Sequence, residues 1–208
     1  MKIYKKDLET IKEVVKIAET KTSGEIVPVI IKQSDDYLYS HYLCALLYTF
    51  IGVILTFGEA LPKTQVSPII YITIMAIVGY SLPKISSLKR ALLNKKERDE
   101  EVNQKALQTF FTNNLHRTKD GTGILIFISL LERKVQILGD HGINQKVDQH
   151  FWDDEVNKLV QSIKEDKLIE GLSQVISTLG DKLAEHFPIQ SDDTNELKNE
   201  LITDLKVY

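Results

Sequence analysis

The chain has 208 residues, of which 43% are hydrophobic and 26% charged, with a formal net charge of −3 at pH 7. This composition is typical of a folded protein and excludes a collagen-like, low-complexity or globally disordered chain. A net charge so near zero argues against a general nucleic-acid binder, and a single cysteine, Cys44, excludes a disulfide framework or a zinc site built on cysteine pairs.

Residues 1–36 predict one helix followed by one strand. Apolar residues recur at helical spacing over 5–22, and Gly24 is a typical stop after such a helix. The β-branched run 25–32 indicates a strand in which Pro28 cannot donate a ladder hydrogen bond, so we expect an edge strand or a bulge there. One helix and one edge strand cannot enclose a core, so this segment must fold together with residues beyond the apolar region.

Residues 37–83 predict a transmembrane helical hairpin. Two runs without Lys, Arg, Asp or Glu, residues 38–57 and 66–82, make up most of this segment. The first run is long enough to cross a hydrocarbon layer of about 30 Å at about 1.5 Å per residue, and the second is near the lower limit of length. The alternative, two buried core helices, is disfavoured by the uniformly apolar character of both runs. His41 lies inside the first run, where a histidine at headgroup level is favoured over a proton-linked residue.

Basic residues flank the two apolar runs unequally. Six lysines and arginines lie within residues 84–98, whereas the connecting segment 58–65 holds only Lys63, opposed by Glu59. Because cytoplasmic loops of membrane proteins carry the excess of Lys and Arg, both termini and the soluble domain are expected in the cytoplasm. The segment 58–65 is then expected on the far side of the membrane.

Residues 84–189 predict the elements that complete the soluble domain, and 190–208 form an acidic tail with one short helix at most. Two of these elements are strands, and the second is expected to pair with the first as an antiparallel hairpin. In chain order the predicted elements are a helix over 95–115, strands over 123–130 and 134–138, and helices over 152–163 and 168–187.

The predicted order is therefore helix–strand, an excursion into the membrane, and then helix–strand–strand–helix–helix. This order fits an α/β fold in which a small mixed sheet of three or four strands is sandwiched by helices. Residues 1–36 and 84–189 would thus make one domain that the hairpin interrupts.

Three stretches of the chain form a combined pattern: AETKTSGEIVPVIIKQSDDY at residues 18–37, LHRTKDGTGILIFISLLERKVQILGDHGI at 115–143, and LAEHFP at 183–188 after a helix with the single tryptophan. In this combination the chain resembles the TPM domain family, and more closely its bacterial membrane proteins in which two transmembrane helices interrupt the domain. The resemblance implies a TPM-like α/β/α sandwich in the bacterial plasma membrane. Through properties linked to relatives, it also implies acid phosphatase activity, divalent-cation binding, or a role in membrane-protein assembly or repair.

A cluster of polar residues is expected at one end of the sheet. If the first two predicted strands run parallel, their first residues lie at the same end, where the third strand finishes. A divalent cation, Ca²⁺ or Mg²⁺, could be held there by Glu25 and Asp140, and Arg117 could clamp a phosphate. The alternative, which we favour because the spacing matches no established ligand motif, is structural: Asp140 in a turn and Glu25 paired with Arg117. The cluster comprises Glu25, His116, Arg117, Asp120, Asp140 and His141.

Two functions are compatible with these features. The favoured one is a non-enzymatic adaptor, or an assembly and quality-control factor, whose partners are the lipid bilayer and other membrane proteins. The alternative is a membrane-anchored, divalent-metal-dependent phosphatase-like hydrolase with a metal-bound water as nucleophile. The adaptor is favoured because the sequence contains no nucleophile elbow, phosphate-binding loop or metalloprotease helix. A transporter is a poorer hypothesis, since neither apolar run carries an Asp, Glu, Lys or Arg.

Overall fold

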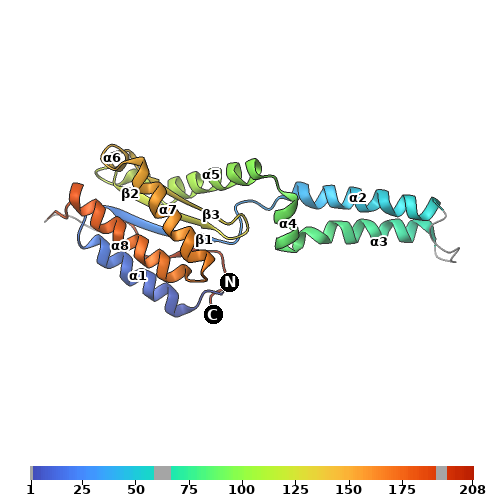
Figure 1. Ribbon diagram of the computed structural model, residues 1–208, viewed down its shortest axis with the longest axis horizontal. Coiled ribbons are helices and arrows are strands. Elements are labelled where there is room, and N and C mark those ends of the chain that lie inside the picture. Colours follow the sequence, from blue (N-terminus) through green and yellow to red (C-terminus); the bar gives the residue numbers. More distant parts are fainter. Residues whose placement is uncertain (1, 59–66, 191–195) are drawn as a thin grey trace. The chain divides into compact units, whose positions relative to one another are not determined.

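The computed structural model describes residues 2–58, 67–190 and 196–208, and the chain divides into two compact units (Figure 1). Residues Met1–Ser34 and Glu100–Tyr208 form the first, which we term the α/β unit. Residues Asp35–Asp99 form the second, which we term the hairpin unit. Residues 59–65, which were expected on the far side of a membrane, lie outside the described part of the chain.

The helices and strands of both units follow the predicted chain order. The hairpin unit contains α2 (Leu38–Phe57), α3 (Pro68–Ser81), the 3-10 helix η1 (Leu82–Lys84) and α4 (Ser86–Leu92), and α5 (Lys95–Thr112) leads from it into the α/β unit. The other elements of the α/β unit are α1 (Lys5–Glu19), β1 (Glu25–Ile31), the 3-10 helix η2 (Leu115–Arg117), β2 (Gly123–Ser129), β3 (Lys134–Gly139), α6 (His141–Asn144), α7 (Gln149–Lys164), α8 (Leu168–His186) and β4 (Ile202–Thr203).

The predicted mixed sheet is confirmed, and it has four strands in the order β3-β2-β1-β4. β1 runs parallel to β2 from Glu25↔Gly123 to Ile31↔Ser129, and β3 pairs with β2 as the expected antiparallel hairpin. β4 lies parallel to β1 over two residues. Every residue of β1 and β2 is buried, because helices cover both faces of these strands.

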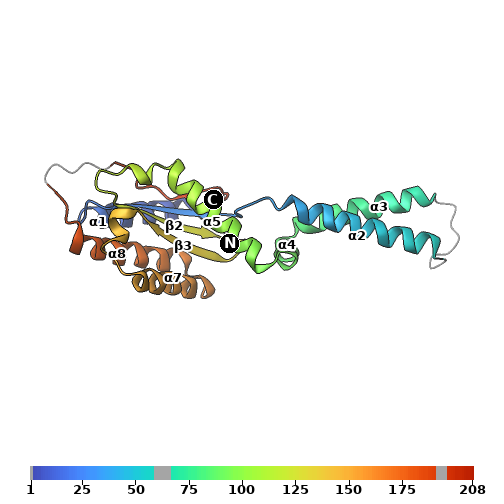
Figure 2. The ribbon, with the colours of Figure 1, turned by 90° about the horizontal axis from the view of Figure 1, so that it is seen from above.

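Two hydrophobic cores lie on opposite faces of the sheet, as the two-residue period of a strand requires. Alternate residues of β1 and β2, such as Ile26 and Ile124, pack with α1, α7 and α8. The residues between them, such as Val27 and Phe127, pack with α5. Figure 2 shows α5 on one side of the sheet and α7 and α8 on the other. The α/β unit is therefore a three-layer α/β/α sandwich.

Pro28 occupies a position on β1 where no backbone donor is needed. The outer edge of β1 faces β4, but the β4 ladder covers only Val29 and Ile30. Two residues before Pro28, the Ile26 N–H already points outward and donates to the Glu19 carboxylate at 3.0 Å. Since backbone direction repeats every two residues, the missing N–H of Pro28 falls on the same outer edge, where no strand lies opposite. The expectation of an edge strand was therefore wrong for β1, which lies between β2 and β4, although no strand lies opposite Pro28 itself.

The described end of the tail forms a strand, so the expectation of a short helix was wrong for residues 196–208. Leu201 is buried, and the β-branched pair Ile202 and Thr203 forms β4 on the outer edge of β1. The Lys32 N–H extends this contact by donating to the Asp204 carboxylate at 2.7 Å. The apolar residues of the tail have helical spacing, but the backbone groups on the outer edge of β1 need hydrogen-bond partners. This need favours a strand over a helix in the tail.

The hairpin unit consists mainly of α2 and α3, which pack closely through two glycines. A Cβ on Gly79 would lie 2.5 Å from the Cys44 carbonyl oxygen and 2.9 Å from Ala45 Cα, and one on Gly52 would lie 3.1 Å from the Met75 side chain. Among the described helices, α2 is long and apolar enough to cross a membrane. A second span is present only if Pro68–Lys84 and Ser86–Leu92, bent by 94°, are taken together.

Candidate functional site

The strand ends that were expected to gather the polar cluster do meet. Glu25 pairs with Gly123 at the start of the parallel strands β1 and β2. Asp140 follows the last residue of β3 and donates its N–H to Gly123 O at 2.9 Å. The 3-10 helix η2 packs at the start of β2, where a Cβ on Gly123 would lie 2.4 Å from Leu115 O. The backbone therefore brings the segments that carry all six predicted residues to the same end of the sheet.

The Glu25 carboxylate is used to hold the C-terminal segment. The side chain is buried, and Oε1 accepts a hydrogen bond from the Glu196 N–H at 2.9 Å. The carboxylate of Glu196 in turn accepts from the Lys119 N–H at 3.1 Å. These contacts tie the tail to β1 and to the turn before β2, which is a structural use of Glu25.

Asp140 caps the short helix α6. Its Oδ1 accepts from the His141 N–H at 2.7 Å and lies 3.3 Å from His141 Nδ1, while Oδ2 is buried and has no hydrogen-bond partner within the described residues. The His141 ring lies against Gly121, where φ is +65° and a Cβ would come within 2.5 Å of the ring. A glycine is therefore required at this turn both for its conformation and for the space that it leaves.

The other three members of the cluster are exposed. His116 packs against the ring of Phe111, with ring centroids 5.0 Å apart. Arg117 and Asp120 are exposed, and no contact within the described residues joins their side chains. Within residues 2–58, 67–190 and 196–208, no group of three or more His, Cys, Asp or Glu side chains is arranged to hold a metal ion. Two members of the cluster, Asp140 and His141, are in direct side-chain contact.

Glu19, which sequence reasoning did not single out, is an acid of the α/β unit with a strongly raised pKa. Burial raises the pKa of this carboxyl to about 8; the Ile26 N–H opposes the rise, and the nearby Glu25 charge adds to it. Asn199 Nδ2, from the C-terminal segment, contacts the second carboxylate oxygen. Glu19 therefore joins α1, β1 and the tail, and its place at the end of an amphipathic helix gave no sequence signal of this role.

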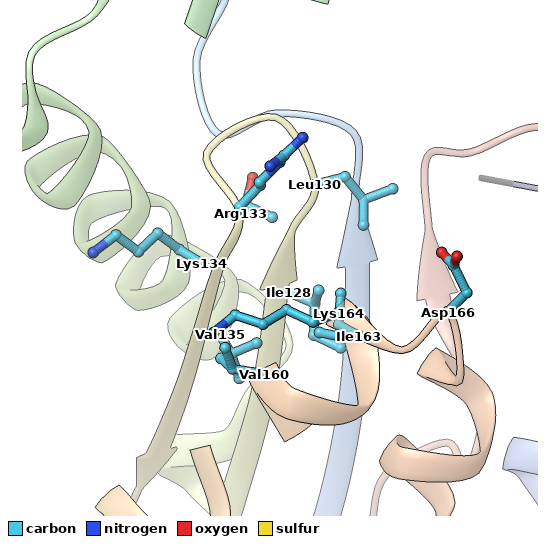
Figure 3. Close-up of a pocket in the computed structure, with 10 residues that line it drawn as sticks. Ile128, Leu130, Arg133, Lys134, Val135, Val160, Ile163, Lys164 and Asp166 are labelled. Carbon is cyan, nitrogen blue, oxygen red and sulfur yellow. The ribbon is translucent and has the colours of Figure 1, made fainter. Parts of the chain in front are cut away.

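Two cavities lie between β3 and α7. One, of about 560 Å³, is lined by apolar side chains from three elements and by charged ones at its rim. Figure 3 shows Lys164 extending across this cavity toward Val135, with Arg133 at the β2–β3 turn and Asp166 on the opposite side. A second cavity, of about 380 Å³, continues along β3 to Gly139 and is bordered by Trp152.

The comparisons with known proteins point to one family and one fold. Residues 89–182, less than half of the chain, match the model of a family described as the TPM domain. The NMR structure of the BA42 protein from the psychrophilic bacterium Bizionia argentinensis is similar, with a TM-score of 0.60 and 21% identity over 97% of this chain and 94% of that chain. At this identity the likeness shows the fold alone. The comparison with curated proteins found no match.

Proposed function

We propose that α2 and α3 anchor the chain in a membrane and that the α/β unit acts as a non-enzymatic adaptor for other membrane proteins. The observation that carries the anchor is the apolar surface of the hairpin unit. In the most apolar 18-residue stretch of α2, only 22% of the residues are buried. A core helix of a water-soluble domain would bury most of such a stretch. The exposed apolar surface of α2 is therefore suited to contact with the hydrocarbon core of a bilayer.

Several polar side chains of α2 and α3 are satisfied within the hairpin unit, as a membrane segment requires. The hydroxyls of Thr49, Thr56 and Thr73 each donate to the carbonyl four residues earlier, at 2.7–2.8 Å. His41 is buried, and its Nδ1 lies 2.9 Å from Tyr80 O, a carbonyl near the end of α3. Because a carbonyl only accepts, this nitrogen carries the proton, and the contact supports a structural use of His41.

The adaptor is supported by how the polar cluster is used. Glu25 holds the tail, Asp140 caps α6, and the described residues form no metal-binding group of three. A metal-dependent hydrolase needs its ligand side chains to converge on one open position, and Glu25 and Asp140 are used in contacts within the chain. The polar groups at this end of the sheet instead stabilise chain connections, which leaves recognition of partners as the function that the α/β unit supports best.

Cross-linking in native membranes tests this function. The full chain, and a variant in which residues 38–82 are replaced by an unrelated two-span hairpin, are cross-linked and purified under denaturing conditions. We expect both to recover the same membrane proteins, because recognition is assigned to the α/β unit.

The hydrolase alternative makes a different prediction in the same preparation. It requires hydrolysis of p-nitrophenyl phosphate that depends on Ca²⁺, Mg²⁺ or Mn²⁺ and is lost in Asp140→Asn. Asparagine is as good a helix cap as aspartate, so this variant removes a metal ligand while it preserves the α6 cap. Metal-dependent hydrolysis of this kind, with no membrane protein recovered by cross-linking, would refute the adaptor.

A further inference from the structure

We propose that the open edge of β3 and the side of α7 form a groove that binds an extended segment of a partner protein as an added antiparallel strand. The segment has apolar residues at alternate positions and a C-terminal carboxylate at the end near Arg133 and Lys164. This inference rests on the proposed adaptor function and identifies the surface through which the α/β unit recognises its partners.

The outer edge of β3 presents backbone groups without partners. β3 is the last strand of the sheet, and Asp140, directly after it, points its N–H toward β2. Since backbone direction alternates along a strand, Val135 and Ile137 point their N–H and C=O groups away from β2. Within the part of the chain that the structure describes, these groups of Val135 and Ile137 make no hydrogen bond. Such an edge is a template for an additional strand.

An independent contact confirms this backbone direction. Gly139 has the same parity as Val135 and Ile137, and its carbonyl accepts a hydrogen bond from Asn144 Nδ2 at 2.6 Å on the side away from β2. The turn after β3 therefore already uses one outward carbonyl. The open length for an added strand runs from Arg133 to Ile137.

α7 makes one wall of the groove, and the two cavities lie along it. The larger cavity is floored by Ile128, Val135, Val160 and Ile163. The smaller one is lined by neighbouring residues of β3 and α7, and both include Val135. Side chains two residues apart on a strand are about 7 Å apart and point to the same face, which matches two adjacent apolar pockets. The added strand is therefore expected to carry two apolar residues separated by one residue of any kind.

Trp152 supplies a buried donor that has no partner within the described residues. The residue is 5% exposed and borders the smaller cavity, and its Nε1 makes no hydrogen bond there. Gly139 lies beside this ring, since a Cβ on it would be 3.4 Å from Trp152 Cζ2. Trp152 therefore borders the smaller cavity, and its single indole N–H can report on what occupies that cavity.

Charge sets the direction of the added strand. Neither Arg133 nor Lys164 has an ion pair or side-chain hydrogen bond within residues 2–58, 67–190 and 196–208, and both stand at the end of the groove where β3 begins. Asp153 lies at the other end, where it accepts from Gln149 at 3.1 Å. Lys134 also lines the larger cavity, and Figure 3 shows its ammonium group extending away from Arg133 and Lys164. A segment that places its carboxylate near Lys164 runs antiparallel to β3.

A groove with one helical wall suits a single added strand better than a second copy of this chain. If two copies paired through their β3 strands, the strands would lie about 4.8 Å apart, and both α7 helices would lie over this one pair of strands. Packed helices need about 8–10 Å between their axes, so the two α7 helices would clash. Self-association through β3 is therefore an outcome that would overturn the proposal.

The test uses the full chain, labelled with ¹⁵N, in lipid nanodiscs. The probe is a pool of eight-residue peptides with free C-termini, Val, Ile or Leu at alternate positions and other residues random. Since Trp152 is the only tryptophan, its indole N–H gives a single resonance that reports on the groove. We expect selected peptides to shift this resonance and to slow amide exchange of Val135 and Ile137.

Two charge-reversal variants provide the matched comparison. Lys164→Glu, in the last turn of α7, should weaken binding of the selected peptides at least tenfold. Lys16→Glu, in the last turn of α1 and away from β3, should change it less than twofold. Val135→Pro, which removes one outward donor and no β2–β3 bond, should also weaken binding.

The proposal is overturned if no peptide moves the Trp152 resonance, if Lys16→Glu weakens binding as much as Lys164→Glu, or if the β3 amides become protected by self-association alone. The failure of the groove can be told from the failure of the adaptor. If Lys164→Glu and Val135→Pro still cross-link to the same membrane proteins, the groove is wrong and the adaptor stands; if nothing is cross-linked to the wild type, the adaptor itself is wrong.

Discussion

Replacing Glu19 with glutamine is expected to stabilise the α/β unit at alkaline pH and to remove most of its stability change between pH 5 and pH 9. The pKa of Glu19 is raised to about 8 in the folded chain, so the folded state binds this proton more tightly than the unfolded state. The stabilisation from protonation is complete below about pH 4.5 and is lost as the pH rises through 8. Glu19→Gln stays neutral throughout, and at pH 9 we expect a gain of about 3 kcal/mol in the free energy of unfolding.

The hydrogen bonds of Glu19 are compatible with this change. A glutamine oxygen can still accept from the Ile26 N–H, and the Asn199 amide can turn to accept from the new amino group. The measurement is denaturant unfolding of the full chain in detergent at pH 5, 7 and 9, followed by Trp152 fluorescence. Glu13→Gln, on an exposed position of the same helix, is the control. Parallel stability curves for Glu19→Gln and Glu13→Gln would contradict the assigned pKa.

Adding one methyl group at Gly79 is expected to separate α2 from α3. The new Cβ would meet backbone atoms of Cys44 and Ala45 at 2.5 and 2.9 Å, and backbone cannot move aside without shifting a helix. At Gly52 the crowding is milder, because the new Cβ would lie 3.1 Å from Met75 Cβ and Cγ and 3.6 Å from the nearest backbone atom, Ile72 Cα. Overpacking of this kind costs about 1–3 kcal/mol, so we expect Gly79→Ala to destabilise the hairpin by about 2 kcal/mol and Gly52→Ala by much less.

Cys44 provides the readout for these two variants. It is buried between the helices and is the single cysteine of the chain, so its labelling by N-ethylmaleimide in micelles reports on opening of the hairpin. We expect Gly79→Ala to label more than tenfold faster than the wild type and Gly52→Ala to label at nearly the wild-type rate. Equal rates for the two variants would show that the close approach at Gly79 does not hold the helices together.

Residue patterns were most informative where one physical requirement dominated. The first apolar run has the same bounds as α2, residues 38–57. Within these bounds no charged residue or proline interrupts the helix. Pro28 lacks a donor and so indicated a place on β1 with one unpaired side, although β1 is not an edge strand, and the outward Ile26 N–H shows why proline is tolerated there. The parallel pairing of β1 and β2 followed from a helix-containing connection between two apolar strands.

Other features depend on contacts between residues far apart in the chain. β4 forms because the outer edge of β1 needs partners, which the weak helical pattern of the tail did not reveal. The raised pKa of Glu19 comes from its burial, against the opposing hydrogen bond from the Ile26 N–H, and no local pattern indicates it. Likewise, the polar cluster could be assigned to one end of the sheet, but the capping role of Asp140 and the tail contact of Glu25 required the structure.

The proposed membrane anchor is tested most directly by measuring on which side of the membrane each end of the hairpin lies. In a chain with Cys44 replaced by alanine, single cysteines are introduced at Lys63, between the two apolar runs, and at Tyr208. Intact cells are treated with a membrane-impermeant maleimide before and after the membrane is opened. If residues 58–65 lie outside the cell and the C-terminus inside, Lys63→Cys is labelled in intact cells and Tyr208→Cys is labelled only after the membrane is opened. Labelling of both positions only after opening, with the chain released from membranes by alkaline carbonate, would contradict the proposed anchor.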